Sequence, residues 1–202
     1  KPKAASYVPN GADVGHFLLP PGTDAPAKPE EYVDIDSPIA VYVGAIASWF
    51  DVELLTATAV QLPGVTFVVI GPVDTEVSAL AALSNVKLLG RRPYDTLPGY
   101  LHHGDVGLIP FKRNALVDGV SPIKLYEYLA SGLPVVATRW AELERVRPPA
   151  ALCEDADGFV SAVRGALETP DAQGDREMRV GFARAADWGG RLGVMLEAVG
   201  VG

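Results

Sequence analysis

The sequence has few of the residues from which disulfides, metal centres and membrane spans are built. It contains one cysteine, Cys153, and three histidines among 202 residues. A single cysteine excludes an intrachain disulfide, and no grouping of histidines and carboxylates points to a metal site, so we expect no metal. The chain also lacks any run of 18 consecutive apolar residues, the length that a membrane-crossing helix requires. Its apolar content of 49% is nevertheless sufficient for a sizeable core.

The sequence also has fewer basic than acidic residues. The chain has 17 lysines and arginines against 25 aspartates and glutamates, which gives a formal net charge of −8. A general nucleic-acid binder needs a basic surface to meet the phosphate backbone, so we expect no nucleic-acid partner. If the ligand is an anion, a local positive site within an acidic protein must bind it.

Three common motifs of nucleotide and ester chemistry are missing. No Gly-x-Gly-x-x-Gly follows the first predicted strand, which argues against a dinucleotide-dependent oxidoreductase. A Gly-x4-Gly-Lys-[Ser/Thr] phosphate loop and a Gly-x-Ser-x-Gly nucleophile elbow are likewise absent from the sequence. Phosphoryl transfer by a phosphate loop and serine hydrolysis of the elbow type are therefore disfavoured.

Short apolar segments alternate with helical patterns along most of the chain. Strands are predicted at 39–43, 65–70, 86–89, 106–109, 134–137 and 150–153, and helices at 52–62, 76–83, 97–103, 122–131, 155–167, 176–186 and 190–199. Strands that are apolar throughout are covered on both faces, and alternation with helices implies parallel pairing. We therefore expect the α/β class, with one doubly wound, Rossmann-like parallel sheet of about six strands. Ligands of such sheets bind beyond the carboxyl ends of the strands, where the strand order reverses.

The segment 121–136 carries the strongest local signals. Ser121 is suited to cap the predicted helix and Pro122 to begin its first turn. Gly132 stands where a helix ends in the left-handed conformation, and Pro134 prevents its continuation. A short helix with both ends marked is therefore expected to lead directly into a buried strand.

Lys124 occupies the place in this helix where a capping box would put a glutamate or glutamine. A cation is unfavourable at the positive end of a helix dipole unless an anion binds there, against the free backbone N–H groups. Glu127 follows one turn later, where its carboxylate could accept both hydroxyls of a ribose. We interpret the pair as a cradle for a nucleoside diphosphate; the alternative is an ordinary exposed Lys–Glu pair.

Glycine and arginine residues that follow predicted strands are further candidates. Gly44 ends the first strand, where a glycine lets the backbone approach a ligand or simply turns the chain. Arg91 and Arg92 follow Gly90 in a loop expected to face the same crevice, unless they are a solvated pair. His16 would lie near the site if the early part of the chain folds back.

The sequence resembles the donor-binding half of GT-B glycosyltransferases, in particular the large retaining family numbered four and its exopolysaccharide relatives. The most specific part of the resemblance is the Lys-x-x-Glu helix followed by Gly-Leu-Pro-Val-Val at 132–136. The opening 8–13 resembles the passage between the two domains of these enzymes, and the ending around 186–188 resembles their closing segment. The likeness covers nearly all of the chain.

The resemblance implies a nucleotide-sugar donor held by residues 1–202. Lys124 would act as the catalytic cation, and Glu127 matches the glutamate that binds the ribose diol. Gly119 stands where the family has its first glutamate. The implied donor-binding set is Gly44, Arg91, Arg92, Gly119, Ser121, Ile123, Lys124 and Glu127. The arginine and lysine that usually follow the first strand are replaced by Ala45 and Phe50.

The resemblance further implies polysaccharide biosynthesis in the cytoplasm, at or near the inner membrane face, with no cofactor or metal. We expect an acceptor domain before residue 1, which would hold a glycan or lipid-linked acceptor, so that the present residues alone would bind donor without turnover. Two alternatives are a nucleotide-sugar epimerase of the same general fold and a non-catalytic nucleotide-binding domain.

Overall fold

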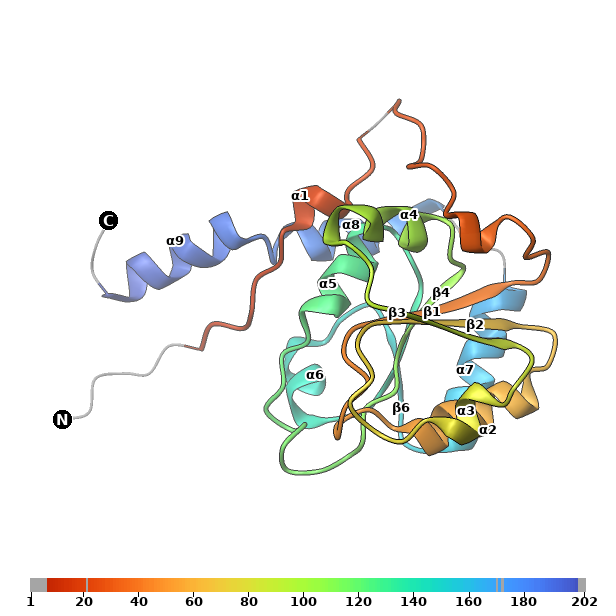
Figure 1. The fold of residues 1–202 in the computed structure, drawn as a ribbon. Coiled ribbons are helices and arrows are strands. Elements are labelled where there is room, and N and C mark those ends of the chain that lie inside the picture. Colours follow the sequence, from red (N-terminus) through yellow and green to blue (C-terminus); the bar gives the residue numbers. More distant parts are fainter. Residues whose placement is uncertain (1–6, 21, 170, 172, 200–202) are drawn as a thin grey trace.

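A six-stranded parallel sheet forms the centre of the molecule (Figure 1). The computed structural model describes residues 7–20, 22–169, 171 and 173–199. The strands are β1 (Ile39–Val43), β2 (Thr66–Ile70), β3 (Val86–Gly90), β4 (Val106–Ile109), β5 (Val135–Thr138) and β6 (Ala151–Cys153). They lie in the order β3-β2-β1-β4-β5-β6, and each neighbouring pair is parallel. The predicted α/β fold with about six parallel strands is confirmed.

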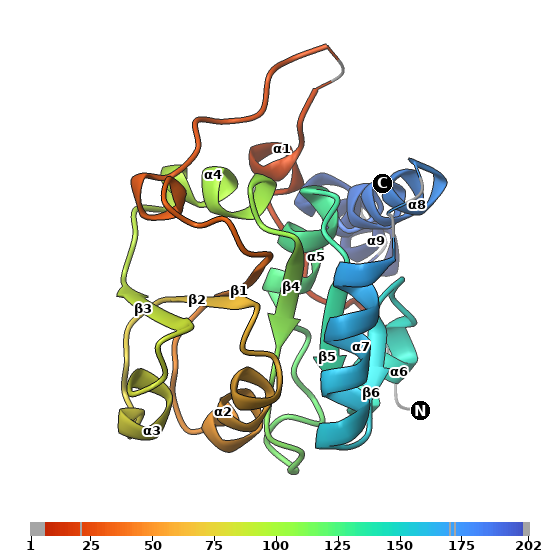
Figure 2. The ribbon, with the colours of Figure 1, turned by 90° about the vertical axis from the view of Figure 1, so that its right-hand side faces the viewer.

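Helices cover both faces of this sheet. Those of eight residues or more are α2 (Val52–Gln61), α5 (Ile123–Ala130), α7 (Ala156–Glu168), α8 (Gln173–Arg184) and α9 (Trp188–Val199). The shorter ones are α1 (Val14–Phe17), η1 (Glu30–Tyr32), α3 (Ser78–Ala81), η2 (Tyr94–Thr96), α4 (Leu97–His102) and α6 (Ala141–Val146). Helices α2, α3 and α7 lie on one face, and α4, α5 and α8 on the other (Figures 1 and 2). The predicted helices were found, whereas α1, α6 and the two 3-10 turns were not predicted.

The strands are apolar because both of their faces are buried. All five residues of β1 and all four of β4 and of β5 are buried, whereas the edge strand β3 is half-buried throughout. Burial of apolar side chains stabilises such a sheet by roughly 1.5–3 kcal/mol per large residue. The continuous apolar segments of the sequence therefore mark the inner strands correctly.

Strands β1 and β4 separate beyond Val41, and this separation creates the crevice at the switch in strand order. Their pairing is limited to Ala40 with Val106 and Val41 with Gly107. The backbone N–H of Val43 instead donates to the Tyr128 hydroxyl of α5, at 2.7 Å. A buried N–H without a partner is costly, so this hydroxyl stabilises the end of β1 where no neighbouring strand remains. Gly107 makes room for the Tyr128 ring, because a Cβ there would lie 2.5 Å from it.

Helix α9 extends away from the body of the molecule (Figure 1). It carries exposed apolar side chains, among them Leu192, Val194 and Leu196. A single parallel bridge between Ala12 and Asp187 joins the early chain to the start of α9. Within the described residues, the structure contains no helix with the length and apolarity that a bilayer crossing needs.

Candidate functional site

A cavity of about 600 Å³ opens at the carboxyl ends of β1 and β4. This is the place at which a doubly wound sheet binds its ligands. Its walls come from β1 and the loop after it, from the loop after β4, from the first turns of α5 and from the early chain. The lining residues are Asn10, Val43, Gly44, Trp49, Phe111, Leu116, Val120, Ser121, Pro122, Ile123, Lys124 and Glu127. The structure thus brings together five of the predicted site residues.

The N-terminus of α5 is uncapped and faces this cavity. Pro122, rather than the predicted Ser121, occupies the N-cap position, and no side chain caps the helix. The prediction of Ser121 as the cap was wrong because its hydroxyl faces Asn10, whose backbone N–H lies 3.3 Å away. Among the described residues, the backbone N–H groups of Ile123 and Lys124 have no hydrogen-bond acceptor. Two donors at the positive end of a helix dipole are therefore available to an anion.

Lys124 places its ammonium between two aromatic rings at the inner end of the cavity. The Nζ atom lies 5.0 Å from the centroid of the Tyr42 ring and 4.6 Å from that of Phe111. Within the described part of the chain, no carboxylate lies within ion-pair distance of it. Burial lowers the pKa of Lys124 from 10.5 to about 8, and Glu127 partly opposes this shift. The rings stabilise a cation without neutralising it, so the ammonium remains available to a bound anion.

Gly44 allows the lysine to reach this position. Its φ of 145° is one that residues with a Cβ rarely adopt, and a Cβ there would lie 2.9 Å from both Cε and Nζ of Lys124. Gly71 stands next to it with a φ of 146°, and a Cβ at Gly71 would lie 2.0 Å from the Gly44 carbonyl oxygen. The two glycines that end β1 and β2 are therefore required by close packing beneath the cavity.

Glu127 lies one turn along α5 from Lys124, and it is half-buried. Burial raises the pKa of its carboxyl group, while Lys124 and then His16 lower it and Asp13 raises it. His16 belongs to α1, which packs on α5, and it stacks on the Tyr94 ring at 4.5 Å. The early chain therefore folds back toward the site, and the charges of α1 influence the carboxylate of Glu127.

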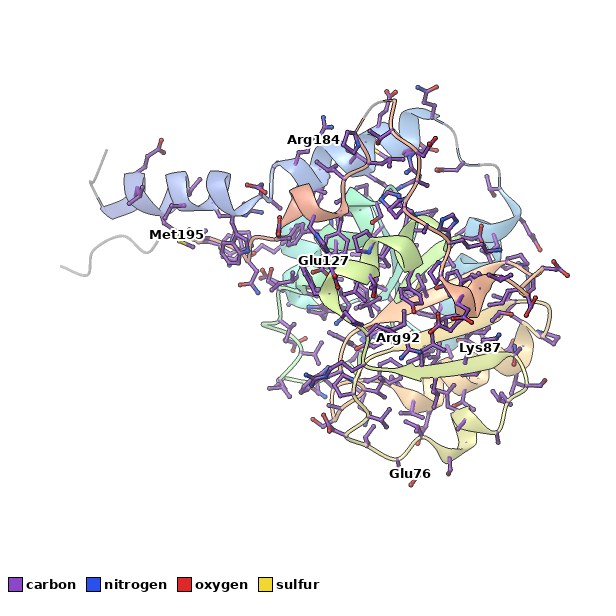
Figure 3. The ribbon with its side chains drawn as sticks, turned by 45° about the horizontal axis from the view of Figure 1, so that its top comes forward. Glu76, Lys87, Arg92, Glu127, Arg184 and Met195 are labelled. Carbon is purple, nitrogen blue, oxygen red and sulfur yellow. The ribbon has the colours of Figure 1, made fainter. Side chains whose placement is uncertain are left out.

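The remaining predicted residues lie elsewhere. Arg92 forms an ion pair with Glu31 of η1 at 2.7 Å and also contacts the Tyr100 hydroxyl. Figure 3 shows Arg92 beside β3, apart from Glu127 on α5. Arg91 and Gly119 are exposed, and neither lines the cavity. The structure therefore does not bring these three residues to the N-terminus of α5.

Several residues of the site were not singled out from the sequence. Tyr42 and Phe111, which lie on either side of the lysine, looked like ordinary core residues in the sequence. Tyr42 belongs to β1, and Phe111 follows β4. Trp49 follows β1 in a loop whose Asp51 N–H donates to the Pro110 carbonyl. Asn10 stands in the opening segment, more than a hundred positions before α5. These three aromatic residues lie at or just after the ends of predicted strands, where the crevice was expected. This position is the signal that could have identified them as site residues.

Other reactive groups give little support for different chemistry. Across the residues that the structure describes, no group of three histidine, cysteine or carboxylate side chains is arranged to hold a metal ion. Cys153 is buried and unpaired, and burial raises the pKa of its thiol to about 11. A thiol with a raised pKa is a poor nucleophile at neutral pH.

Comparison with protein families gives one match. A family described as "Glycosyl transferases group 1" matches residues 37–169. A Bacillus subtilis (strain 168) protein named as a teichuronic acid biosynthesis glycosyltransferase, TuaH, is 30% identical over 156 residues. That match covers 73% of this chain and 39% of the relative. The family match at residues 37–169 includes all six strands and helix α5.

Solved structures with the same fold are also found. The sucrose-phosphate synthase of Thermosynechococcus elongatus matches with a TM-score of 0.76 and 21% identity, over 95% of this chain and 51% of its own. The Anabaena protein Alr3699/HepE, solved with UDP and glucose, matches with a TM-score of 0.72 and 16% identity, over 96% of this chain and 56% of its own. The chain thus spans about half the length of these structures and 39% of the curated relative.

Proposed function

Because the chain belongs to the glycosyl transferases group 1 family, we propose that it binds the nucleoside-diphosphate sugar from which a glycosyltransferase transfers the sugar. The observation that carries this proposal is the Lys124 ammonium at the uncapped N-terminus of α5, inside the cavity at the switch point. A diphosphate supplies the anion that both the helix end and the lysine lack. The family membership favours a transferase over the epimerase and the non-catalytic binder.

We assign two parts of the donor, the β-phosphate and the ribose, to residues of this cavity. The β-phosphate would lie against the N–H groups of Ile123 and Lys124, with the backbone at Gly44 and Ser121 close by. The Glu127 carboxylate would accept the ribose hydroxyls. When the bond to the sugar breaks, negative charge grows on the β-phosphate, and the Lys124 ammonium and the helix end stabilise that charge in a partly water-excluded site. These groups would provide the positive charge without a metal or cofactor.

The acceptor and the cellular setting belong to the same proposal. The relatives are about twice as long as this chain or longer, and we place the acceptor, a glycan or lipid-linked molecule, on a further N-terminal domain. Similarity to a protein named for teichuronic acid biosynthesis supports a role in polysaccharide synthesis. We place the reaction in the cytoplasm, at the inner membrane face.

Calorimetry with UDP and GDP tests the proposal directly. We expect one of the two to bind, and Lys124→Met to weaken that binding about 10- to 100-fold, because a hydrogen bond to a charged group contributes about 1.5–3 kcal/mol. Lys87→Met is the matched control, since Lys87 lies on β3, apart from Glu127 (Figure 3). The proposal is wrong if neither nucleotide binds, or if Lys124→Met binds as tightly as the control.

A further inference from the structure

Asn10 connects the early chain to the residue that precedes α5. Its side-chain Nδ2 donates to the Ser121 carbonyl at 2.8 Å, and its backbone N–H donates to the Ser121 hydroxyl at 3.3 Å. Asn10 therefore contacts both oxygen atoms of Ser121. It also lines the cavity together with Ser121, Ile123 and Lys124.

The residues around Asn10 are held firmly on both sides. Ahead of it, the Tyr7 hydroxyl donates to a Glu142 carboxylate oxygen of α6, and the Arg145 guanidinium stacks on the Tyr7 ring at 3.3 Å. After it, Gly11 packs so closely on Trp188 that a Cβ would lie 2.8 Å from the indole. The segment 7–12 thus runs from α6, past the N-terminus of α5, to the first residue of α9.

The Ser121 carbonyl lies just before the N-cap of α5 and accepts a hydrogen bond from Asn10. If this carbonyl turned toward the cavity, its oxygen would face the same anion that the N–H groups of Ile123 and Lys124 are free to bind. The Asn10 amide holds the carbonyl by donating to it, and so leaves those N–H groups unoccupied. An aspartate cap of the kind found on α2 and α7 would instead place a carboxylate at this helix end, against the N–H of Leu125, where it would compete with an anion.

We propose that Asn10 is a positioning residue of the donor site, one that keeps the first turn of α5 open for the diphosphate of a nucleotide sugar. This inference rests on the proposed function. Because segment 7–12 also contacts α9, a ligand that tightens the first turn of α5 will also tighten this segment. Binding at the cavity is thereby coupled to the early chain and to the start of α9.

The test uses the 202-residue chain, with UDP and GDP as probes. We expect Asn10→Ala to raise the Kd of the bound nucleotide about threefold to tenfold, the usual effect of losing one hydrogen bond. Asn10→Asp has the same shape but cannot donate when ionised, and we expect it to weaken binding at least as much. Asn85→Ala is the matched control, because Asn85 Nδ2 also donates to backbone carbonyls, among them that of Ala59, away from the cavity.

Hydrogen exchange provides a readout that a merely structural role would not change. In the wild type, nucleotide binding should slow exchange of the Ala12 and Trp188 amides, which pair the early chain with the start of α9. In Asn10→Ala, the nucleotide at saturation should leave these rates unchanged. The inference is overturned if Asn10→Ala and Asn10→Asp both bind like the wild type, or if the variant retains the protection. Failure of the wild type to bind UDP or GDP overturns the proposed function itself and this inference with it.

Discussion

Among the helices of eight residues or more, three begin where a strand ends, at the carboxyl edge of the sheet, and they begin in two different ways. Helix α2 is capped by Asp51, which accepts from the Leu54 N–H at 2.9 Å, and α7 by Asp155, which accepts from the Gly158 N–H at 2.8 Å. Helix α5 has a proline at the same position, no cap, and a lysine in its first turn. Among the described helices of this length, the edge thus holds two N-termini that an aspartate caps and one that no side chain caps.

This difference separates stability from function at one edge of the sheet. An aspartate cap neutralises the positive end of its helix and typically contributes about 1 kcal/mol. At α5 the protein forgoes that stabilisation and also buries an ammonium whose pKa is lowered to about 8. Both features are unfavourable in the ligand-free protein and favourable once an anion is bound. The unsatisfied helix end is therefore the one expected to bind the substrate.

A capping side chain on α5 would make its N-terminus resemble those of α2 and α7. Among changes at these helix ends, we expect this one to have the largest effect on nucleotide affinity. Pro122 has φ −79° and ψ 117°, an extended conformation that an aspartate cap can adopt. Pro122→Asp should stabilise the protein by about 0.5–1 kcal/mol, because the carboxylate accepts an N–H of the first turn and neutralises the positive end of the helix. The same carboxylate should weaken nucleotide binding by about 30-fold through occupancy and repulsion. Calorimetry and thermal unfolding measure the two effects.

Pro122→Asn separates these two causes, because asparagine caps a helix about as well as aspartate but carries no charge. We expect its loss of affinity to be smaller than that of Pro122→Asp. Equal losses would show that occupation of the N–H groups alone accounts for the effect. Unchanged affinity in both variants would mean that the N-terminus of α5 does not contact the nucleotide.

The titration of Lys124 provides a second, smaller test of the open helix end. Since the pKa of Lys124 is about 8, the ammonium is charged at pH 7 and mostly neutral at pH 9. Nucleotide affinity should therefore fall about tenfold between pH 7 and pH 9, because the Lys124 side chain must be protonated to bind the anion. Lys124→Arg keeps its charge over this range and should show a flat profile, whereas Lys87→Met should follow the wild type. Calorimetry at several pH values measures the profile.

The lowered pKa of Lys124 also predicts that the nucleotide-free protein becomes more stable as the pH rises, whereas its nucleotide affinity falls. The pKa of Lys124 is lower in the folded chain than the ordinary value of 10.5, so the unfolded chain binds the proton more tightly. The contribution of this group to the free energy of unfolding should therefore rise as the pH increases from about 8 to about 10.5. A wild-type profile that is indistinguishable from that of Lys124→Met would contradict the buried ammonium.

The contrast between capped and uncapped ends could be partly predicted from the sequence. Lys124 stood out because its charge does not suit the first turn of a helix. Glu127 stood out because it lies one turn after Lys124, and Gly44 because it ended a predicted strand. The six strands could be predicted because their side chains are apolar on both faces. Each of these signals is local, so a single sequence is enough to detect it.

Features that depend on contacts distant in sequence could not be predicted. Arg92 was expected in the crevice, but Glu31 of η1, which lies 61 positions earlier in the chain, binds it in an ion pair. Helix α6 begins after Trp140 without a side-chain cap and ends at Arg147, whose φ of 52° takes the place of a glycine stop, so neither a capping residue nor a glycine marks it. Asn10 becomes part of the site only after the early chain folds onto α5. The binding roles of the lining residues remain predictions.

We expect the smallest effect on nucleotide affinity from substitutions at the capped N-termini of α2 and α7. Asp155→Ala should cost about 1 kcal/mol and lower the Tm by about 2–4 °C, because the Gly158 N–H loses its acceptor. Its nucleotide affinity should stay within about twofold of the wild type, since α7 does not line the cavity. Asp157→Ala is the matched control, because Asp157 lies exposed in the same turn and influences only the dipole, by a few tenths of a kcal/mol. If Asp155→Ala weakened nucleotide binding as much as Pro122→Asp, the two kinds of helix end would not have separate roles.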